Sequence, residues 1–199
     1  MTNLDIIKQA NQLLEGKRLI PIGVVILIMI FTGIPQNIDN KLSILSILIS
    51  GPIGVGTAIF FLNFVRGYDA RLEQLFDGFR QFIPSVILAV LTIIVVILGL
   101  VCLIVPGIIL GLGLMFSTYV MADNPELSAM DVMRKSWDMT DGYKMKLFLF
   151  CLLSGCLVIL GLLFFIIGIF YVMPIIYTAT ALFYEKLKDG TIEHSTDTI

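Results

Sequence analysis

Residues 81–122 read QFIPSVILAVLTIIVVILGLVCLIVPGIILGLGLMFSTYVMA, a run of 42 residues that contains no Asp, Glu, Lys or Arg. A helix rises 1.5 Å per residue, so about 20 apolar residues cross a hydrocarbon core of roughly 30 Å. The run is twice that length. Near its middle, Pro106 lacks a backbone donor and Gly107 relaxes the backbone. We therefore expect two membrane helices joined by a structural turn at Pro106 and Gly107.

Three more stretches lack charged residues: 19–38, 42–65 and 147–184. The first two have the length of one crossing each. The third has 38 residues and should fold back once, between Gly168 and Pro174. The sequence thus predicts an all-α membrane protein with six transmembrane helices arranged as three hairpins.

The composition of the 199 residues agrees with this prediction. Hydrophobic residues make up 58% and charged residues 14%, with a mean hydropathy of +0.99, whereas soluble domains carry roughly 25% charged residues. Such hydrophobicity excludes a disordered chain. The net charge of −2 gives no indication of a nucleic-acid partner. The three cysteines lie in apolar runs without a C-x-x-C pair, so we expect neither a disulfide framework nor a metal site.

The placement of basic residues predicts the orientation. If the N-terminus is cytoplasmic, 12 of the 13 Lys and Arg residues fall on the inner side, and Lys41 is the exception. The positive-inside rule describes this bias. We therefore expect a multi-pass protein of the bacterial cytoplasmic membrane with both termini inside. A signal peptide is the competing interpretation of Lys17-Arg18 and the apolar run after them. It is disfavoured because the run is long and no A-x-A-like site follows.

Short polar segments before each predicted hairpin resemble one another. Their glycines, Gly16, Gly78 and Gly142, are 62 and 64 residues apart, and the VILGL sequence at 96–100 recurs at 158–162. We interpret this as a pseudo-threefold repeat within one domain, residues 1–188, with units at approximately 1–66, 67–122 and 123–188. The polar tail 189–199, which contains the single histidine His194, is expected to be a disordered cytoplasmic segment.

Each polar segment is expected to form an amphipathic helix in the membrane interface. Thr2 with Asp5 and Ser128 with Asp131 have capping-box spacing, Asp69 can cap the middle helix, and the glycine can end each helix in a left-handed conformation. Asn124-Pro125 is expected to begin the third helix. The apolar stripes at helical spacing are Leu4, Ile7 and Leu14, then Leu72, Leu75, Phe76 and Phe79, then Met130, Met133 and Trp137.

The third segment carries the densest charges of the three. Asp131 with Lys135 and Arg134 with Asp138 are i,i+4 pairs, each worth a few tenths of a kcal/mol. The simpler interpretation of these charges is a solvated helix face. The functional alternative is a cytoplasmic docking surface formed by Asp131, Arg134, Lys135, Trp137 and Asp138.

A further pattern is formed by Val105-Pro106-Gly107-Ile108-Ile109, Tyr119, Asp123-Asn124-Pro125, Ser128, Ser136 and Gly142. In this pattern the chain resembles an uncharacterised bacterial membrane family, domain of unknown function 975. One departure follows Phe148, where the family pattern implies a tryptophan and this chain has Gly155-Cys156. The family is similar in layout to YciC-type proteins and to the membrane domain beside some glycerophosphodiesterases. The resemblance implies a polytopic membrane fold and no established activity.

Catalytic chemistry is not expected. The charge-free stretches hold no Asp, Glu, Lys, Arg or His, residues that proton-coupled pumps usually place within the membrane. No P-loop, GxGxxG or HExxH motif is present. We therefore predict a protein that is not an enzyme, with no catalytic residues, no cofactor and no metal.

The second charge-free stretch contains the candidate kink or binding element, formed by Gly51, Pro52, Gly54, Gly56 and Asn63. Glycines and a proline at mid-bilayer predict a kinked or broken helix with freed carbonyls, a device that builds substrate sites in transporters. The alternative interpretation is close helix packing through small residues.

Two functional hypotheses follow. The first is a non-enzymatic membrane module that binds lipid or an unidentified cytoplasmic or membrane protein. The second is a channel or carrier for a neutral or apolar small solute that passes along the second helix. Self-association into a homo-oligomer is compatible with both.

Overall fold

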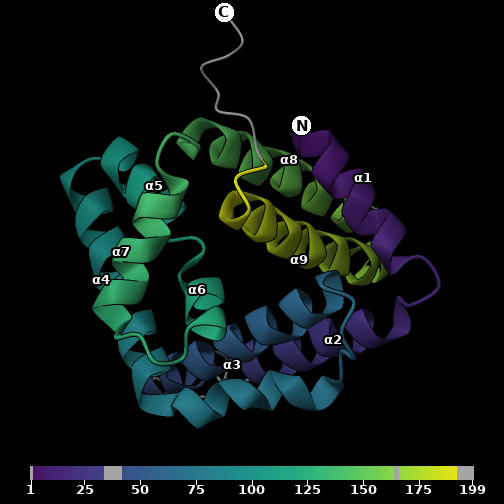
Figure 1. Ribbon diagram of the computed structural model, residues 1–199, viewed down its shortest axis with the longest axis horizontal. Helices are drawn as coiled ribbons and strands as arrows, with labels where there is room; N and C mark the ends of the chain where they lie inside the picture. The colour runs from purple at the N-terminus through teal and green to yellow at the C-terminus, as the bar shows by residue number, and fades with distance from the viewer. Residues whose placement is uncertain (1, 34–41, 164–165, 192–199) are drawn as a thin grey trace, which may run out of the picture.

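The computed structural model describes residues 2–33, 42–163 and 166–191, and the regular structure in these ranges is helical throughout. The elements, shown in Figure 1, are α1 (Asn3–Leu14), α2 (Leu19–Gly33), α3 (Leu42–Val65), the 3₁₀ helix η2 (Leu72–Gln81), α4 (Phe82–Cys102), α5 (Ile104–Gly113), α6 (Ser117–Asp123), α7 (Ala129–Thr140), α8 (Lys144–Leu163) and α9 (Ile166–Lys188).

Within these ranges, five helical segments are long and apolar enough to cross a membrane: Leu48–Val65, Leu72–Cys102, Ile104–Asp123, Lys144–Leu163 and Gly168–Lys188. The helix α2 is apolar over Leu19–Phe31 but shorter. The end of the first predicted span and Lys41 lie outside the described residues. The architecture is therefore that of an all-helical, multi-pass membrane protein.

Both predicted hairpin turns are wrong in position. The chain breaks at Leu103, which has extended backbone angles, and Pro106 and Gly107 lie in the first turn of α5. A helix tolerates proline in its first turn because the N–H groups there have no intrahelical partner. Gly168 and Pro174 lie inside α9, and α8 is separated from α9 by residues 164–165, outside the described residues.

Pairs of glycines bring neighbouring helices together instead. A Cβ atom on Gly99 of α4 would lie 2.9 Å from the Cα of Gly107 in α5. In the same way, a Cβ atom on Gly161 of α8 would lie 3.1 Å from the carbonyl oxygen of Gly168 in α9. Small residues allow membrane helices to approach this closely. Gly99 and Gly161 occupy the same position in the two VILGL sequences, which explains why both carry glycine there.

The helix ends confirm part of the capping prediction. Thr2 and Asp5 form a complete capping box on α1, and the Ser128 hydroxyl accepts from the Asp131 N–H at the start of α7. The middle element differs, because Arg71 precedes η2 and Asp69 pairs with Arg71 instead of capping. Gly16 and Gly142 adopt the left-handed conformation, whereas Gly78 lies inside η2. Asn124 caps the end of α6, so Asn124-Pro125 does not begin α7.

The apolar stripes were only partly predicted. In α1 the buried residues are Ile6, Ala10 and Leu14, while Leu4 is exposed. In η2 only Leu75 of the predicted stripe is buried. Apolar side chains of an interfacial helix can be buried against lipid as well as against protein. The helical spacing of apolar residues therefore does not show which of the two environments they face.

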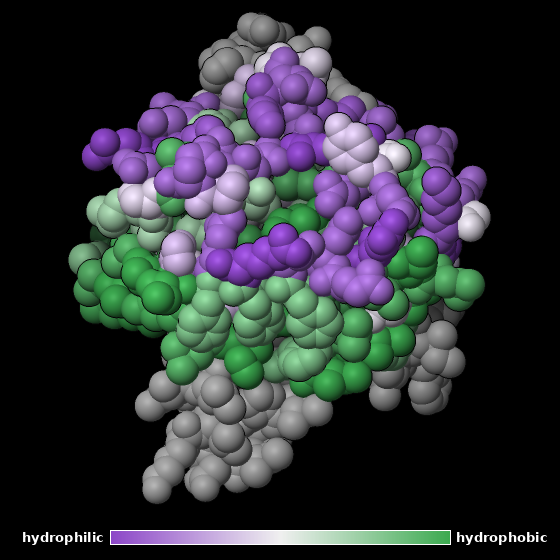
Figure 2. All heavy atoms as spheres, turned by 60° about the horizontal axis from the view of Figure 1, so that its bottom comes forward, coloured by the Kyte–Doolittle hydropathy of each residue, from purple (hydrophilic) through white to green (hydrophobic). Residues whose placement is uncertain are grey.

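The elements η2, α7 and α1 each pack against apolar helices. η2 lies on α3, α7 lies against α5 and α6, and α1 lies against α9. Figure 1 shows α3, α6 and α9 facing the middle of the molecule, with α4, α8 and α1 toward the outside. Hydrophilic residues gather on one face, which is hollowed near its centre, above a band of hydrophobic residues (Figure 2). The fold thus joins a polar face to an apolar body around three central helices.

The capping box of α1 predicts an acid-sensitive helix end. The Thr2 hydroxyl and the Thr2 N–H donate to Asp5, and these bonds hold the pKa of Asp5 below its ordinary value of 3.8. A lowered pKa in the folded state means that folding favours the carboxylate. The contribution of Asp5 is therefore complete at neutral pH and is lost as the pH falls below 3.8.

Carbon-13 spectra of labelled aspartate, recorded against pH, should give Asp5 a pKa below 3.8. At neutral pH, Asp5→Asn should speed amide exchange in the first turn of α1 and leave α7 unchanged. An Asp5 that titrates at or above 3.8 would contradict the capping geometry.

Candidate functional site

The discontinuous membrane helix is not the one that the sequence predicts. The helix α3 runs unbroken through Pro52, whereas the segment Ile104–Asp123 breaks after Gly113, and α6 resumes at Ser117. The carbonyl freed at Gly113 accepts a hydrogen bond of 2.8 Å from the Ser136 hydroxyl of α7. A broken helix within a membrane requires such replacement partners. A break in α3 is therefore wrong, and the break lies between α5 and α6, while a kink of α3 at Pro52 stays a prediction.

Most of the predicted element in α3 serves close packing. A Cβ atom on Gly51 would lie 2.6 Å from the Ser85 carbonyl oxygen, and one on Gly56 would lie 2.6 Å from the carbonyl carbon of Leu75. Gly78 of η2 packs in turn on the backbone of Pro52 and Gly56. Asn63 lies half-buried near the end of α3.

Gly54 faces the other way, into a cavity of about 230 Å³ among α2, α3, α6 and α9. Its lining is Ile28, Ser50, Ile53, Gly54, Thr57, Ala58, Thr118, Tyr119 and Tyr177. A Cβ atom on Gly54 would sit 3.4 Å from the Thr118 methyl group on the opposite wall. The cavity adjoins the broken helix, since Thr118 and Tyr119 are in the first turn of α6. Its lining contains five hydroxyl groups and no charged residue.

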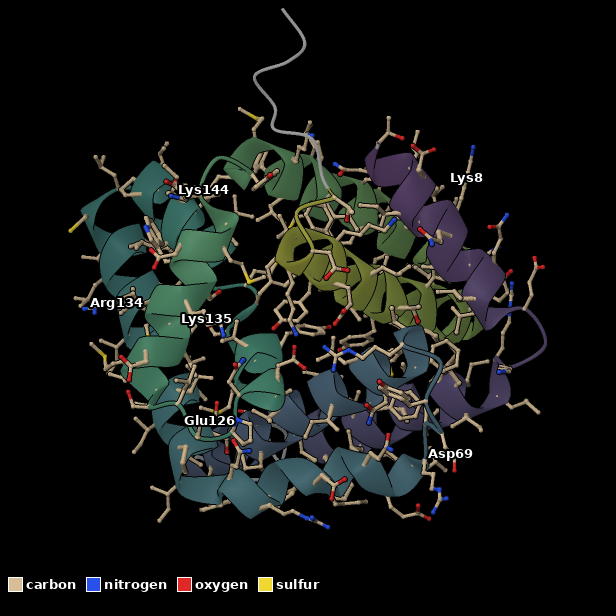
Figure 3. The ribbon with its side chains drawn as sticks, in the orientation of Figure 1. Lys8, Asp69, Glu126, Arg134, Lys135 and Lys144 are labelled. Atoms are coloured by element: carbon tan, nitrogen blue, oxygen red, sulfur yellow. The ribbon has the colours of Figure 1, made fainter. Side chains whose placement is uncertain are left out.

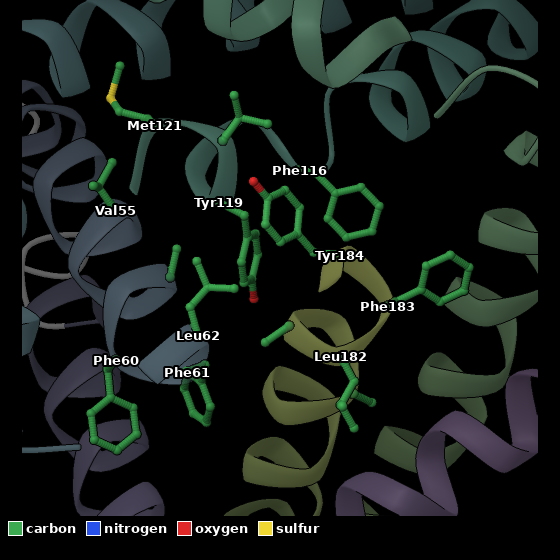
Figure 4. Close-up of a cluster of buried hydrophobic side chains, with 14 of the residues drawn as sticks. Val55, Phe60, Phe61, Leu62, Phe116, Tyr119, Met121, Leu182, Phe183 and Tyr184 are labelled. Carbon is green, nitrogen blue, oxygen red and sulfur yellow. The ribbon is translucent and has the colours of Figure 1, made fainter. Parts of the chain in front are cut away.

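A layer of aromatic rings separates this cavity from the polar face. Tyr119 stacks on Tyr184 with 5.6 Å between ring centroids, and Phe61 stacks on Tyr177 at 5.2 Å. Phe116 packs against both Tyr119 and Tyr184. In Figure 4 the hydroxyls of Tyr119 and Tyr184 point in opposite directions. The Tyr184 hydroxyl donates to Asp123 at 3.1 Å, which connects the aromatic layer to charges above it.

Those charges form a network that ties together the ends of α3, α6 and α9. Arg66 Nη2 lies 2.8 Å from the Asp123 carboxylate and 2.5 Å from Glu185 Oε1. Lys188 Nζ lies 2.7 Å from Asp123 Oδ2. Burial by itself would lower the pKa of Arg66, but its hydrogen bonds to Glu185 and Asp123 outweigh burial and raise it. The two positive and two negative charges balance, so the network is neutral and locks the three helices together.

The predicted docking residues divide between two sides of α7. Asp131, Arg134, Lys135 and Asp138 are exposed and line an open groove with Leu127 and Met139. Figure 3 shows Arg134 pointing away from the molecule and Lys135 pointing toward α6, where its Nζ donates to Asn124 Oδ1 at 2.9 Å. Trp137 instead packs on Gly113 of α5, with Lys144 Nζ 3.7 Å from its ring centroid. Lys135 therefore bonds Asn124 instead of its expected partner Asp131.

Residues 89–191, just over half of the chain, match a family described as "Protein of unknown function (DUF975)". The chain belongs to the DUF975 family. No curated protein and no solved structure matches it. In this DUF975 protein the matched region begins in α4 and ends after α9. It covers the broken helix, the rings of Phe116, Tyr119, Tyr177 and Tyr184, and two of the three helices in the ion-pair network, whereas Phe61 and Arg66 lie before it.

Sequence reasoning missed the central residues of this DUF975 site. Asp123 and Arg66 flank charge-free stretches, and the charge pattern places them on the inner face without indicating partners. Gly111-Leu112-Gly113 followed by Ser117-Thr118 was the available signal for the broken helix. Across residues 2–33, 42–163 and 166–191, no group of three or more His, Cys, Asp and Glu side chains is placed to hold a metal ion. His194 and most of the predicted tail lie outside these ranges.

Proposed function

We propose that this DUF975 protein is a non-enzymatic carrier that binds a small neutral solute in the cavity among α2, α3, α6 and α9. The observation that supports it most directly is the position of the cavity beside the break between α5 and α6. Discontinuous helices form the substrate sites of many transporters, because their ends present polar groups within the membrane. The proposal places six membrane helices in the bacterial cytoplasmic membrane, with both termini and the polar face inside.

The packing order supports a threefold repeat in this proposal. Three units, each an amphipathic element followed by two membrane helices, would stand around one axis. Each amphipathic element would then contact the second membrane helix of the preceding unit, in agreement with the contacts of η2, α7 and α1. The second membrane helices are α3, the α5–α6 segment and α9, and the cavity lies where these three helices face one another.

The network of Arg66, Asp123, Glu185 and Lys188, together with Tyr184, would act as the gate on the cytoplasmic side. It joins α3, α6 and α9 directly above the aromatic layer. Opening the cavity toward the polar face requires α6 to separate from α3 and α9, which breaks the bonds of Asp123. Because the network is neutral as a whole, closing it leaves no unbalanced charge at the membrane surface.

Gly54→Leu should abolish solute flux by filling the cavity. The leucine side chain would extend from the α3 wall toward Thr118 and occupy the space that the solute needs. The measurement is flux of urea, glycerol and erythritol into proteoliposomes, followed by light scattering. We expect flux in the wild type and background flux in the variant.

The matched control for this test is Gly155→Leu, at an exposed position of α8 where an added Cβ atom would meet open space. It should keep wild-type flux. Equal flux in Gly54→Leu and the wild type would overturn passage through the cavity. Absence of flux for all three solutes in folded wild-type protein would overturn the carrier proposal itself.

A second candidate is the lipid- or protein-binding module. The observation that favours it is the open groove along α7, lined by side chains of both charges together with Leu127 and Met139. A cytoplasmic protein of mixed surface charge would fit this groove. We prefer the carrier because the groove belongs to one helix face, whereas four helices contribute residues to the lining of the cavity.

A further inference from the structure

We infer that the ligand of the cavity is an uncharged molecule with at least two hydrogen-bonding groups, such as a small polyol or amide, and not an apolar molecule. The inference rests on the proposed carrier function and specifies its substrate class. Some of the hydroxyl groups that line the cavity have a hydrogen-bond partner within the protein, and others have none.

Hydroxyl groups in membrane helices usually bond to their own backbone. In this chain Thr57 donates to the Ile53 carbonyl at 2.7 Å, Thr180 to Ile176 at 2.8 Å, and Ser85 to Phe82 at 2.9 Å. These three groups therefore need no further partner. They show that a hydroxyl in this fold can donate to a backbone carbonyl of its own helix.

Three hydroxyls of the cavity lining differ. Within the described part of the chain, the side-chain hydroxyls of Thr118, Tyr119 and Tyr177 make no hydrogen bond. Their oxygens are not among the buried atoms without a partner, so they are accessible to water or to a ligand in the cavity. By contrast, the hydroxyls of the neighbouring residues Ser117 and Thr178 are buried without a partner. Unpaired hydroxyls are thus concentrated where α6 and α9 face the cavity.

An apolar ligand would displace water from the hydroxyls of Thr118, Tyr119 and Tyr177 and leave them unpaired, which costs free energy. A ligand that bonds these hydroxyls avoids this cost. Asp, Glu, Lys and Arg are absent from the lining, so a charged ligand would lose its hydration without gaining a counter-ion. The chemistry of the walls therefore selects a neutral, polar molecule.

The size of the cavity limits the ligand. A volume of about 230 Å³ equals that of roughly seven water molecules at ~30 Å³ each. The faces of the Tyr119 and Tyr177 rings and the side chains of Ile28 and Ile53 supply apolar contacts for a short carbon skeleton. A compact polyol or amide meets both requirements.

The test removes single oxygen atoms. Tyr119→Phe and Tyr177→Phe keep the ring packing and delete the hydroxyl. The matched control Thr180→Val deletes a hydroxyl of α9 that lies outside the cavity lining and is bonded to Ile176. Flux of urea, glycerol and erythritol is measured in proteoliposomes of monodisperse protein. We expect each Tyr→Phe variant to slow the preferred solute about tenfold, as for loss of one hydrogen bond of ~1.4 kcal/mol, and Thr180→Val to retain wild-type flux.

The outcomes separate this inference from the proposed function. If Gly54→Leu stops flux but both Tyr→Phe variants carry the solutes at the wild-type rate, the carrier stands and the hydrogen-bonding ligand class is overturned. If Gly54→Leu has no effect, the cavity is not the path and the proposed function fails. Faster flux in the Tyr→Phe variants would show that the walls favour apolar solutes, which also overturns the inference.

Discussion

Gly56→Ala should destabilise the protein by about 3 kcal/mol or more, although alanine is the better helix former. The added Cβ atom would overlap the Leu75 carbonyl oxygen and would lie 3.0 Å from the Leu75 Cα. These are backbone atoms of η2, which cannot rotate away as a side chain can. Gly78 of η2 already contacts the α3 backbone, so η2 would have to leave its position on α3 as a unit.

The measurement is the free energy of unfolding in mixed micelles at increasing SDS concentration. The control is Gly155→Ala in α8, where the new methyl group meets open space. At this position the new methyl group meets no neighbour, so the higher helix propensity of alanine is the one effect expected. We expect the free energy of unfolding to rise by up to about 1 kcal/mol. Gly56→Ala with stability equal to the wild type would show that η2 does not rest on α3 as described.

Asp123→Asn should cost about 2–4 kcal/mol and should raise solute leak through the closed protein. Asp123 is 8% exposed in its side chain and compensates both Arg66 and Lys188. Its removal leaves those two cations with Glu185 as their one remaining acidic partner in the network. Breaking a buried ion pair by deleting one partner costs roughly 3–5 kcal/mol. We expect a somewhat smaller cost than that range because the side chain of Lys188 is 49% exposed.

Asp69→Asn is the matched control. Asp69 lies 2.7 Å from Arg71, the same distance that separates Asp123 from Lys188, but both side chains of that pair are mostly exposed at 74% and 67%. Exposed pairs contribute less than about 1 kcal/mol. Both variants are measured by SDS unfolding and by erythritol leak from loaded liposomes. The comparison tests the effect of burial, because the two ion pairs have the same N–O distance and differ in how far their side chains are exposed. Similar small effects in both would contradict a gate held by Asp123.

The hydrophobic pattern predicted the class of this fold well and its details less well. Charge-free stretches identified α3, α4 and α8 as apolar helices and separated them from polar segments. Helix ends governed by local bonds, such as Thr2 with Asp5, could also be predicted. Pro106-Gly107 misled because the same two residues suit a turn and the first turn of a helix. The close contact between Gly99 of α4 and Gly107 places Gly107 inside a helix and not in the turn. Such a contact between two helices is not specified by the local sequence.

The candidate site shows the same division. Gly54 was predicted to belong to a binding element and does line the cavity, but Tyr119 and Tyr177 were not associated with it. Tyrosines near helix ends fit an interfacial belt equally well. Which of them turn inward depends on the rotation of α6 and α9, which is set by packing and not by composition.

The sequence by itself determined that the chain is a helical membrane protein with a polar face, because hydrophobicity and local capping are properties of short segments. The tertiary structure decided where the membrane helix breaks, which glycines touch, and that Arg66, Asp123, Glu185 and Lys188 meet. These residues are up to 122 positions apart. Their meeting depends on the relative placement of α3, α6 and α9, which many weak packing contacts fix together and no single segment specifies.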